Sequence, residues 1–277
     1  MDQNDYYRSN AFVEEREEDY CPTDSLLPRG IERVSVEAIA SSRLVTPEVI
    51  AHEGSPVTIA AFDFDGTCIN GSSPKRLVSV LTKRKRINCY KLLRIALWGL
   101  AYKFNLPNKD AEGVRERVFS AFAGHSAVAV NRFLCDFYHD KVEPNYRMEA
   151  DAEMVAHLEA GHVVVVVSAS FEPIVASAMV EHPIQYALGS RMKIDSHGAY
   201  TDEVEGLPTE GADKLFALRK FADEMFGAGS WKLGFAYGDH YSDLTLLEAA
   251  EHSYAVTPDQ KLARYARQHG WNIVEWD

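Results

Sequence analysis

Four short and almost continuous apolar runs stand out along the chain. They are VTIAAF (57–62), GHVVVVVSAS (161–170), WKLGFAYGDH (231–240) and SYAVT (253–257). Continuous runs of this length are typical of strands that are buried on both faces, as in a parallel sheet covered by helices. The pattern therefore predicts four central strands.

Segments with helical spacing of apolar residues follow or precede these strands. Residues 149–161 and 213–227 each end at a glycine that can stop a helix. For the last segment, Thr257 is the expected N-cap, Pro258 the first helical residue and Gly270 the stop. This alternation of strand and helix predicts a doubly wound, mostly parallel α/β domain.

One interval is too long for an ordinary crossover, because Asp63 and Ser168 are 105 positions apart. Residues 75–145 contain several helical patterns, which predict a helical domain inserted after the first strand. Residues 189–206 alternate around DSHG and predict a small β-hairpin. The expected organisation is an N-terminal extension (1–55), a core domain (56–74 and 146–277) and a helical cap domain (75–145).

Composition narrows the classes of function. The formal net charge of −12 argues against nucleic acid as a general partner. Residues 1–24 carry eight acidic residues and two arginines, which indicates a solvated extension. The first residues lack the pattern of a signal peptide, and the apolar stretch 92–102 is too short to span a bilayer, so we expect a cytoplasmic protein. The four widely spaced cysteines favour reduced thiols.

Polar residues of one chemical kind end several of the predicted strands. Asp63 and Asp65 end the first strand, and its period of two points both to the same side. Asp239 and Asp243 follow the third strand, and a helical turn there would place them on one face. Because ligands of open α/β sheets bind beyond the carboxyl ends of the strands, these carboxylates are expected to converge at one sheet edge.

Such a cluster of carboxylates needs a cation or a proton to neutralise it. Oxygen ligands select a hard cation, and Mg²⁺ suits a site that also holds phosphate. Gly66 would let the backbone approach such a ligand closely. Ser168 at the end of the second strand supplies a further donor, and Lys214 can balance the remaining charge.

These residues carry a family resemblance. DFDGT, VVVVVSAS, Lys214 within GADKLFALRK, and GDHYSD resemble the four ordered motifs of the haloacid dehalogenase superfamily. The helical insert resembles the cap of its phosphoserine-phosphatase-like branch, subfamily IB. The resemblance covers about residues 57–277 and implies a Rossmann-like core with a C1-type cap, in an Mg²⁺-dependent hydrolase of phosphomonoesters.

The resemblance also implies a role for each matched residue. Asp63 would attack phosphorus to form an aspartyl-phosphate, and Asp65 would act as general acid and base. An acid at Asp65 favours phosphate esters over halides, because halide leaves without a proton. The implied Mg²⁺ ligands are Asp63, Asp65 through its carbonyl, Asp239 and Asp243. The implied phosphate-binding residues are Gly66, Thr67, Ser168, Ala169 and Lys214.

Two stretches bear on the substrate. Phosphoserine phosphatases of this branch carry an acid shortly after the first motif, whereas INGSSPK here has none, which argues against phosphoserine. Residues 75–103 carry nine lysines or arginines and no acid. This basic stretch is either a solvated face of the cap or a surface for a lipid-type or larger phosphomonoester, with peripheral contact to an anionic membrane.

Several alternatives stay open at the level of sequence. A phosphotransferase would use the same residues, and a catalytically inactive binding protein could share the scaffold. For the charge-balancing lysine, Lys220 and Lys193 are the alternatives to Lys214. His240 is expected at the rim of the site in a structural role, and Ser72 and Ser73 at the hinge of the cap. The pattern predicts neither the oligomeric state nor a role for residues 1–55.

Overall fold

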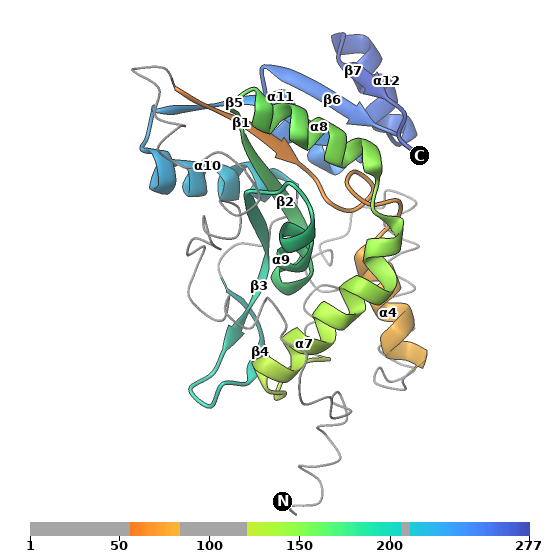
Figure 1. The fold of residues 1–277 in the computed structure, drawn as a ribbon, viewed down its shortest axis with the longest axis vertical. Coiled ribbons are helices and arrows are strands. Elements are labelled where there is room, and N and C mark those ends of the chain that lie inside the picture. The colour runs from red at the N-terminus through yellow and green to blue at the C-terminus, as the bar shows by residue number, and fades with distance from the viewer. Residues whose placement is uncertain (1–55, 84–120, 206–210) are drawn as a thin grey trace, which may run out of the picture.

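The protein is described by a computed structural model, which covers residues 56–83, 121–205 and 211–277. Its centre is a seven-stranded sheet in the order β4-β3-β2-β1-β5-β6-β7 (Figure 1). All neighbouring strands are parallel except β3 and β4. The strands are β1 (Val57–Phe62), β2 (Val163–Phe171), β3 (Tyr186–Ile194), β4 (Tyr200–Glu205), β5 (Trp231–Gly238), β6 (His252–Val256) and β7 (Asn272–Val274). The predicted doubly wound, mostly parallel fold is confirmed.

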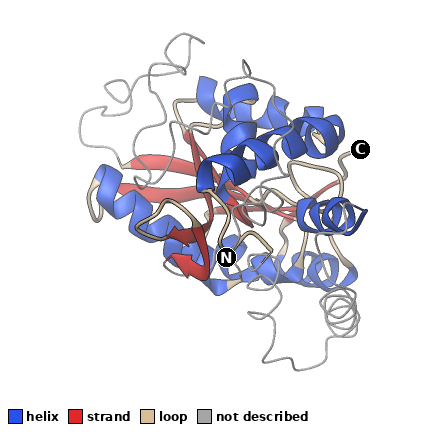
Figure 2. Ribbon diagram, turned by 90° about the horizontal axis from the view of Figure 1, so that it is seen from below, coloured by secondary structure: helices blue, strands red, loops and turns tan. Residues whose placement is uncertain are grey.

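Helices cover both faces of this sheet, and Figure 2 shows the strands enclosed between them. The side chains of β1 alternate between the two layers: Ala60 and Phe62 pack in one cluster, and Ile59 and Ala61 in the other. The valine run of β2 alternates in the same way, which explains why every one of its positions is apolar. The helices are α4 (Ser73–Lys83), α7 (Ala127–Phe137), α8 (Met148–Glu159), α9 (Glu172–Glu181), α10 (Ala212–Phe226), α11 (Leu244–Glu248) and α12 (Gln260–His269).

The two hydrophobic clusters belong to different helices. Side chains from α7, α8 and α9 fill the cluster that contains Phe62. Side chains from α10, α11 and α12 fill the cluster that contains Ile59. Burial of apolar surface contributes about 25 cal/mol per Å², so packing on both faces stabilises β1 at the centre of the sheet.

The four strands predicted from apolar runs are present as β1, β2, β5 and β6. The predicted hairpin is also present, but β3 does more than form a hairpin with β4. Its first residues pair in parallel with β2, from Tyr186 opposite Val165 to Leu188 opposite Val167. The pattern missed this role because β3 alternates between buried and partly exposed positions instead of being apolar throughout. The three-residue strand β7 was too short to be recognised.

The start of α12 corrects one prediction. Asp259, not Thr257, is the N-cap, because its side chain accepts a hydrogen bond from the backbone N–H of Leu262 at 2.6 Å. The Thr257 side chain instead pairs with the backbone of Trp276. The predicted stop is correct, since Gly270 adopts a left-handed conformation with φ of 68°.

Within the predicted cap (75–145), the structure describes most of α4, all of α7 and a π-helical turn, Tyr138–Val142. The N-terminal extension (1–55) and most of the basic stretch lie outside the described residues, so the division into domains stays a prediction. In the three ranges that are described, no helix has the length and apolar character needed to cross a membrane.

Candidate active site

The candidate site lies where the direction of winding changes, because the chain leaves β1 toward β2 on one side and β5 pairs with β1 on the other. Asp63 directly follows β1, and Asp239 directly follows β5. Their strands are paired in parallel up to Phe62 opposite Tyr237, so both acids emerge at the same sheet edge. Open α/β sheets bind ligands at such a switch point.

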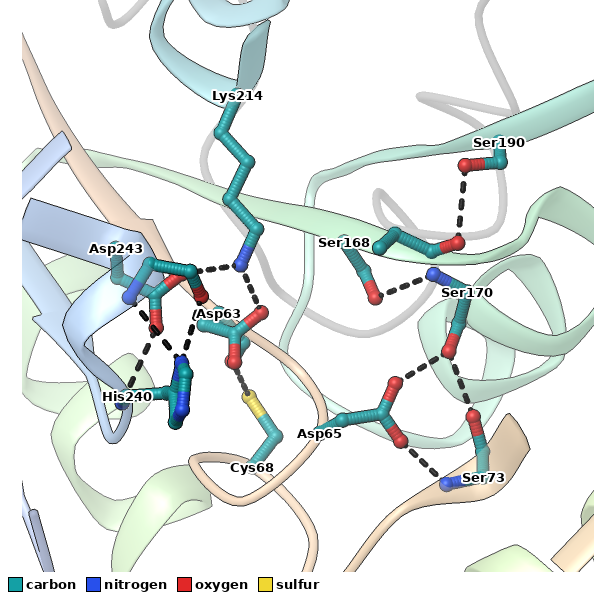
Figure 3. A network of polar contacts seen from close by, with 12 residues as sticks. Asp63, Asp65, Cys68, Ser73, Ser168, Ser170, Ser190, Lys214, His240 and Asp243 are labelled. Carbon is teal, nitrogen blue, oxygen red and sulfur yellow. Dashed lines mark hydrogen bonds and ion pairs between the residues drawn. The ribbon is translucent and has the colours of Figure 1, made fainter. Parts of the chain in front are cut away.

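Three carboxylates meet at this edge. Asp63, Asp239 and Asp243 each offer an oxygen, and these oxygens all lie within 4.8 Å of one another. Lys214, at the start of α10, bridges two of them, with Nζ at 2.5 Å from Asp63 Oδ1 and 2.6 Å from Asp243 Oδ1 (Figure 3). Lys214 is 4% exposed and Asp243 is 1% exposed, so water screens these charges little.

Burial and the close approach of these charges shift the pKa values of the carboxyl groups and of Lys214. Burial raises the pKa of Asp63 to about 7; Lys214 lowers it in part, and the charge of Asp243 raises it further. Burial, followed by the charges of Asp63 and Asp243, raises the pKa of Asp239 to about 9. For Lys214, burial acts to lower the pKa, but the charges of Asp243 and Asp63 outweigh it and raise the pKa. One lysine therefore leaves the carboxylates under-neutralised.

The donor set fits Mg²⁺. Carboxylate oxygens are the ligands that this ion takes in proteins, and it commonly binds through one or two of them together with phosphate. A divalent cation among these oxygens would restore their charged forms, which burial and mutual repulsion disfavour. The residues that would hold it are Asp63, Asp239 and Asp243.

Gly66 makes room for this cluster. Its φ is +91°, and a Cβ at this position would lie 2.1 Å from Oδ2 of Asp239. A side chain here would both strain the backbone and displace the carboxylate. The glycine in DFDGT is therefore required because Asp239, which follows β5, lies against it. This contact joins two motifs that are far apart in the chain.

Asp65 does not join the three carboxylates through its side chain. Oδ1 accepts a hydrogen bond from the backbone N–H of Ser73 at 2.5 Å, and Oδ2 accepts one from the hydroxyl of Ser170 (Figure 3). The hydroxyls of Ser73 and Ser170 are 2.7 Å apart. Burial, the largest influence, raises the pKa of Asp65, and the hydrogen bonds from Ser170 and Ser73 offset part of this effect.

The remaining predicted residues lie around these two groups. Ser168 is 1% exposed, and its hydroxyl accepts a hydrogen bond from the backbone N–H of Ser170. The carbonyl of Ala169 accepts one from the Ser190 hydroxyl. Thr67 is fully buried, and its hydroxyl has no hydrogen-bond partner among the described residues.

His240 and the alternative lysines take other positions. The His240 ring accepts a hydrogen bond from the Ser242 backbone and caps the turn that carries Asp243, and its Nε2 lies 3.2 Å from Asp259. Lys193 pairs with Glu203 in the hairpin, and Lys220 is exposed on α10. Of the three lysines considered, Lys214 is the one placed among the carboxylates.

Three further residues contact the first motif and were not predicted as site residues. Ser170 could have been suggested by its spacing of two from Ser168, which places both on one face of β2. Cys68 donates a hydrogen bond through Sγ to the backbone carbonyl of Asp63 at 3.0 Å. Arg147 donates to the carbonyls of Gly66 and Thr67. Sequence offered no signal for Cys68 or Arg147, because neither belongs to a recognisable pattern.

Known proteins resemble this chain over most of its length. A protein named probable phosphatase from Mycobacterium tuberculosis (strain H37Rv) is 29% identical over 222 residues, which cover 79% of this chain and 75% of that protein. A phosphoserine phosphatase from the same strain is 27% identical over 242 residues, which cover 83% of this chain and 77% of that protein.

Among solved structures, a protein of unknown function from Bordetella pertussis Tohama I matches with a TM-score of 0.71 and 24% identity. The match covers 79% of this chain and 99% of that one, and it supports the fold. The pattern of the haloacid dehalogenase-like hydrolases matches residues 60–248, more than half of the chain. The chain belongs to this hydrolase family, and its relatives include the phosphoserine-phosphatase-like members.

Proposed function

We propose that the protein is an Mg²⁺-dependent phosphatase that hydrolyses a phosphomonoester through an aspartyl-phosphate on Asp63. The observation that carries the proposal is that Asp63 and Asp65, which are two positions apart in the chain, have side chains in two different environments. Asp63 lies in the carboxylate cluster beside Lys214, whereas the Asp65 side chain is hydrogen-bonded to Ser73 and Ser170. Two environments for two acids suit two roles, a nucleophile and a proton carrier.

In the first step, a carboxylate oxygen of Asp63 would form a bond to phosphorus while the ester P–O bond breaks. The bonding electrons leave with the alcohol oxygen, which takes a proton from Asp65. Burial raises the pKa of Asp65, which favours the protonated form that can give this proton. Lys214 would stabilise the charge that develops on the phosphoryl oxygens.

In the second step, water would attack phosphorus as the bond between phosphorus and Asp63 breaks, which restores the carboxylate. The water proton passes to Asp65, which is ionised after the first step and can therefore accept it. Mg²⁺ held by Asp63, Asp239 and Asp243 would supply charge neutralisation for the approach of a phosphate dianion to three carboxylates.

For the substrate we propose a small phosphate ester. Phosphoserine, named in the phosphoserine phosphatase from Mycobacterium tuberculosis, is an ester of this class. The sequence between Asp65 and Lys75 lacks an acid that could meet an ammonium group, so an ester other than phosphoserine is preferred. A lipid-type ester, with peripheral contact of the basic stretch at a membrane, stays an alternative that rests on the sequence of residues 75–103. Transfer of the phosphoryl group to an acceptor alcohol instead of water would use the same residues.

Turnover of p-nitrophenyl phosphate with and without Mg²⁺ tests the proposal. Wild type is expected to be active with Mg²⁺ and inactive with EDTA. Asp63→Asn is expected to be inactive, and Asp202→Asn on the exposed part of β4 serves as the matched control with unchanged activity. A phosphoryl group recovered on the peptide that contains Asp63 would support the covalent step. Equal inactivity of wild type and Asp63→Asn with this substrate and with a panel of phosphorylated metabolites contradicts the proposal.

A further inference from the structure

Arg147 occupies an unexpected position. It is the N-cap residue of α8, where serine, threonine, aspartate or asparagine are the usual choices. Its side chain makes no capping hydrogen bond, and a cation at this end of a helix is opposed by the helix dipole. The arginine therefore does not serve the helix that it starts.

Its charge is also buried. Arg147 is 6% exposed, and none of the carboxylates in the described ranges lies within ion-pair distance of its guanidinium. Charged side chains are seldom buried to this degree without a carboxylate partner. Nη1 instead donates to two successive carbonyls, at 2.5 Å to Gly66 and 3.2 Å to Thr67. Arg147 thus destabilises the start of α8 and is costly to bury, and its hydrogen bonds go to the loop that follows Asp65.

The backbone around Arg147 holds the same loop. Its N–H donates to the carbonyl of Cys68 at 2.9 Å, and Asn70 N–H donates to the carbonyl of Asn145 at 2.8 Å. Ile69 and Tyr146 form an isolated β-bridge between these two contacts. The segment that leads into α8 therefore lies along the whole loop, and the guanidinium extends this pairing to the two peptides nearest Asp65.

The geometry of the peptide group decides what this contact does. In a trans peptide the carbonyl and the next residue's N–H point in opposite directions, and the described residues contain no cis peptide. With the carbonyls of Gly66 and Thr67 held by Arg147, the N–H groups of Thr67 and Cys68 point away from it. Successive N–H groups on one side of a loop form a concavity that binds anions.

The loop also faces the carboxylate cluster and contains an unsatisfied donor. Gly66 lies against the carboxylate of Asp239, so the loop borders the oxygens that would hold Mg²⁺. The hydroxyl of Thr67 is buried without a hydrogen-bond partner in the described part of the chain. Buried polar groups are normally paired, so a partner in the bound state is expected for it.

We propose that Arg147 is a positioning residue for phosphoryl transfer, which fixes the Gly66 and Thr67 peptides so that the following N–H groups face the phosphoryl oxygens. This inference rests on the proposed phosphatase function. It goes beyond that function by assigning a role to a buried arginine outside the four motifs.

The test compares Arg147→Gln and Arg147→Lys with wild type. A lost donor to a developing oxyanion costs about 10²- to 10³-fold in kcat, and Arg147 acts through the peptides, so Arg147→Gln is expected to lower kcat about 10- to 100-fold. Inorganic phosphate should inhibit this variant about tenfold less strongly. Arg147→Lys keeps the charge and a nitrogen with several donors, but its side chain is one atom shorter than that of arginine, so a partial recovery of kcat is expected.

Arg191→Gln is the matched control. Arg191 forms an ion pair with Glu172, with 2.7 Å between Nε and Oε1, and this pair does not involve the loop that follows Asp65. Arg191→Gln should keep the kcat of wild type. Hydrogen exchange of peptides that span residues 64–70 should be faster in Arg147→Gln and unchanged in Arg191→Gln. Exchange reads the loop directly and requires no substrate.

The outcomes separate the two proposals. An active wild type beside an Arg147→Gln variant with unchanged kcat, phosphate inhibition and exchange overturns the role of Arg147 alone. A loss of activity fully explained by the unfolded fraction of Arg147→Gln, with normal kcat for the folded protein, overturns it as well. If wild type is as inactive as Asp63→Asn, the phosphatase proposal fails, and unchanged exchange in residues 64–70 would then refute the positioning of the loop independently.

Discussion

Two clusters of carboxylates in this molecule contain similar residue types and are organised in opposite ways. The Asp cluster consists of Asp63, Asp239 and Asp243 with Lys214. The His182 cluster consists of Glu143, Asp151 and Glu181 around His182, and three of its members could also hold a metal by distance alone. Both clusters therefore bring ligand atoms close together, and they differ in burial and in the balance of charge.

In the His182 cluster the imidazole satisfies its neighbours. Nδ1 lies 2.9 Å from Asp151 Oδ2, and Nε2 lies 2.9 Å from Glu143 Oε2, while Tyr146 stacks on the ring at 3.4 Å. Burial would lower the pKa of His182, but its hydrogen bonds to Asp151 and Glu143 outweigh burial and raise the pKa. A protonated imidazole carries one positive charge, as Lys214 does, but the side chains of Glu143 and Asp151 are about a third exposed, so water screens the negative charge that remains in this cluster.

In the Asp cluster the balance is the reverse. Burial and mutual repulsion raise the pKa values of Asp63 and Asp239, although Lys214 contacts Asp63 directly. The folded protein therefore holds carboxylates in a state that favours uptake of a proton or a cation. We infer that the Asp cluster serves ligand binding and the His182 cluster serves stability.

The largest expected effect comes from Asp239→Asn. Activity should fall about 10²- to 10³-fold, because a bound metal contributes several kcal/mol to stabilising the charge of the transition state. In EDTA and above about pH 9, where Asp239 of wild type is ionised, the same variant should be more stable than wild type by about 1 to 4 kcal/mol, since one like charge has been removed. Urea unfolding with EDTA and with Mg²⁺ measures this. A variant less stable than wild type in EDTA at this pH would contradict the comparison.

The pH dependence of the metal-free protein is the second test. Asp63 and Asp239 have folded pKa values of about 7 and about 9, against an ordinary value of 3.8. The unfolded chain thus binds fewer protons between about pH 4 and pH 9, so stability in EDTA should fall as pH rises through this window. Mg²⁺ should flatten this slope in unfolding curves. A slope of the opposite sign that persists in Asp239→Asn would argue against under-neutralised carboxylates.

His182→Gln is expected to cost about 1 to 3 kcal/mol, because Asp151 and Glu143 lose a charged partner. The pKa of His182 is raised, so its contribution is fully present below pH 6.5 and is lost as pH rises through the folded value. Urea midpoints at pH 5.5 and pH 9 should therefore differ from wild type more at the lower pH. His197→Gln, at an exposed turn, is the control and should change neither midpoint.

The smallest effect is expected for Glu181→Gln. Glu181 pairs with His139 at 3.1 Å, but both side chains are more than a third exposed, so the change should stay within about 0.5 kcal/mol. Phosphatase activity should be unchanged. A thermal stabilisation of wild type by Zn²⁺ that disappears in both Glu181→Gln and His182→Gln would break the comparison, since it would identify the His182 cluster as a second metal site.

Much of the fold followed from pattern. The four apolar runs became β1, β2, β5 and β6, because strands buried on both faces require apolar residues at every position. The first residues of β3 were not recognised as part of the main sheet, since partly exposed positions interrupt their apolar character. Local chemistry at a strand end also misled, as the N-cap of α12 is Asp259 and not Thr257.

The sequence by itself determined which residue types stand at the ends of the central strands, because the order of apolar and polar positions is a one-dimensional property. It therefore predicted Asp63, Asp239 and Lys214 as members of one site. Only the tertiary structure decided that Asp65 turns toward Ser73 and Ser170, and that Arg147 meets the carbonyls of Gly66 and Thr67. Ser73 is eight positions from Asp65, and the other contacts join residues 80 or more positions apart; single hydrogen bonds of this kind leave no periodic trace in the chain.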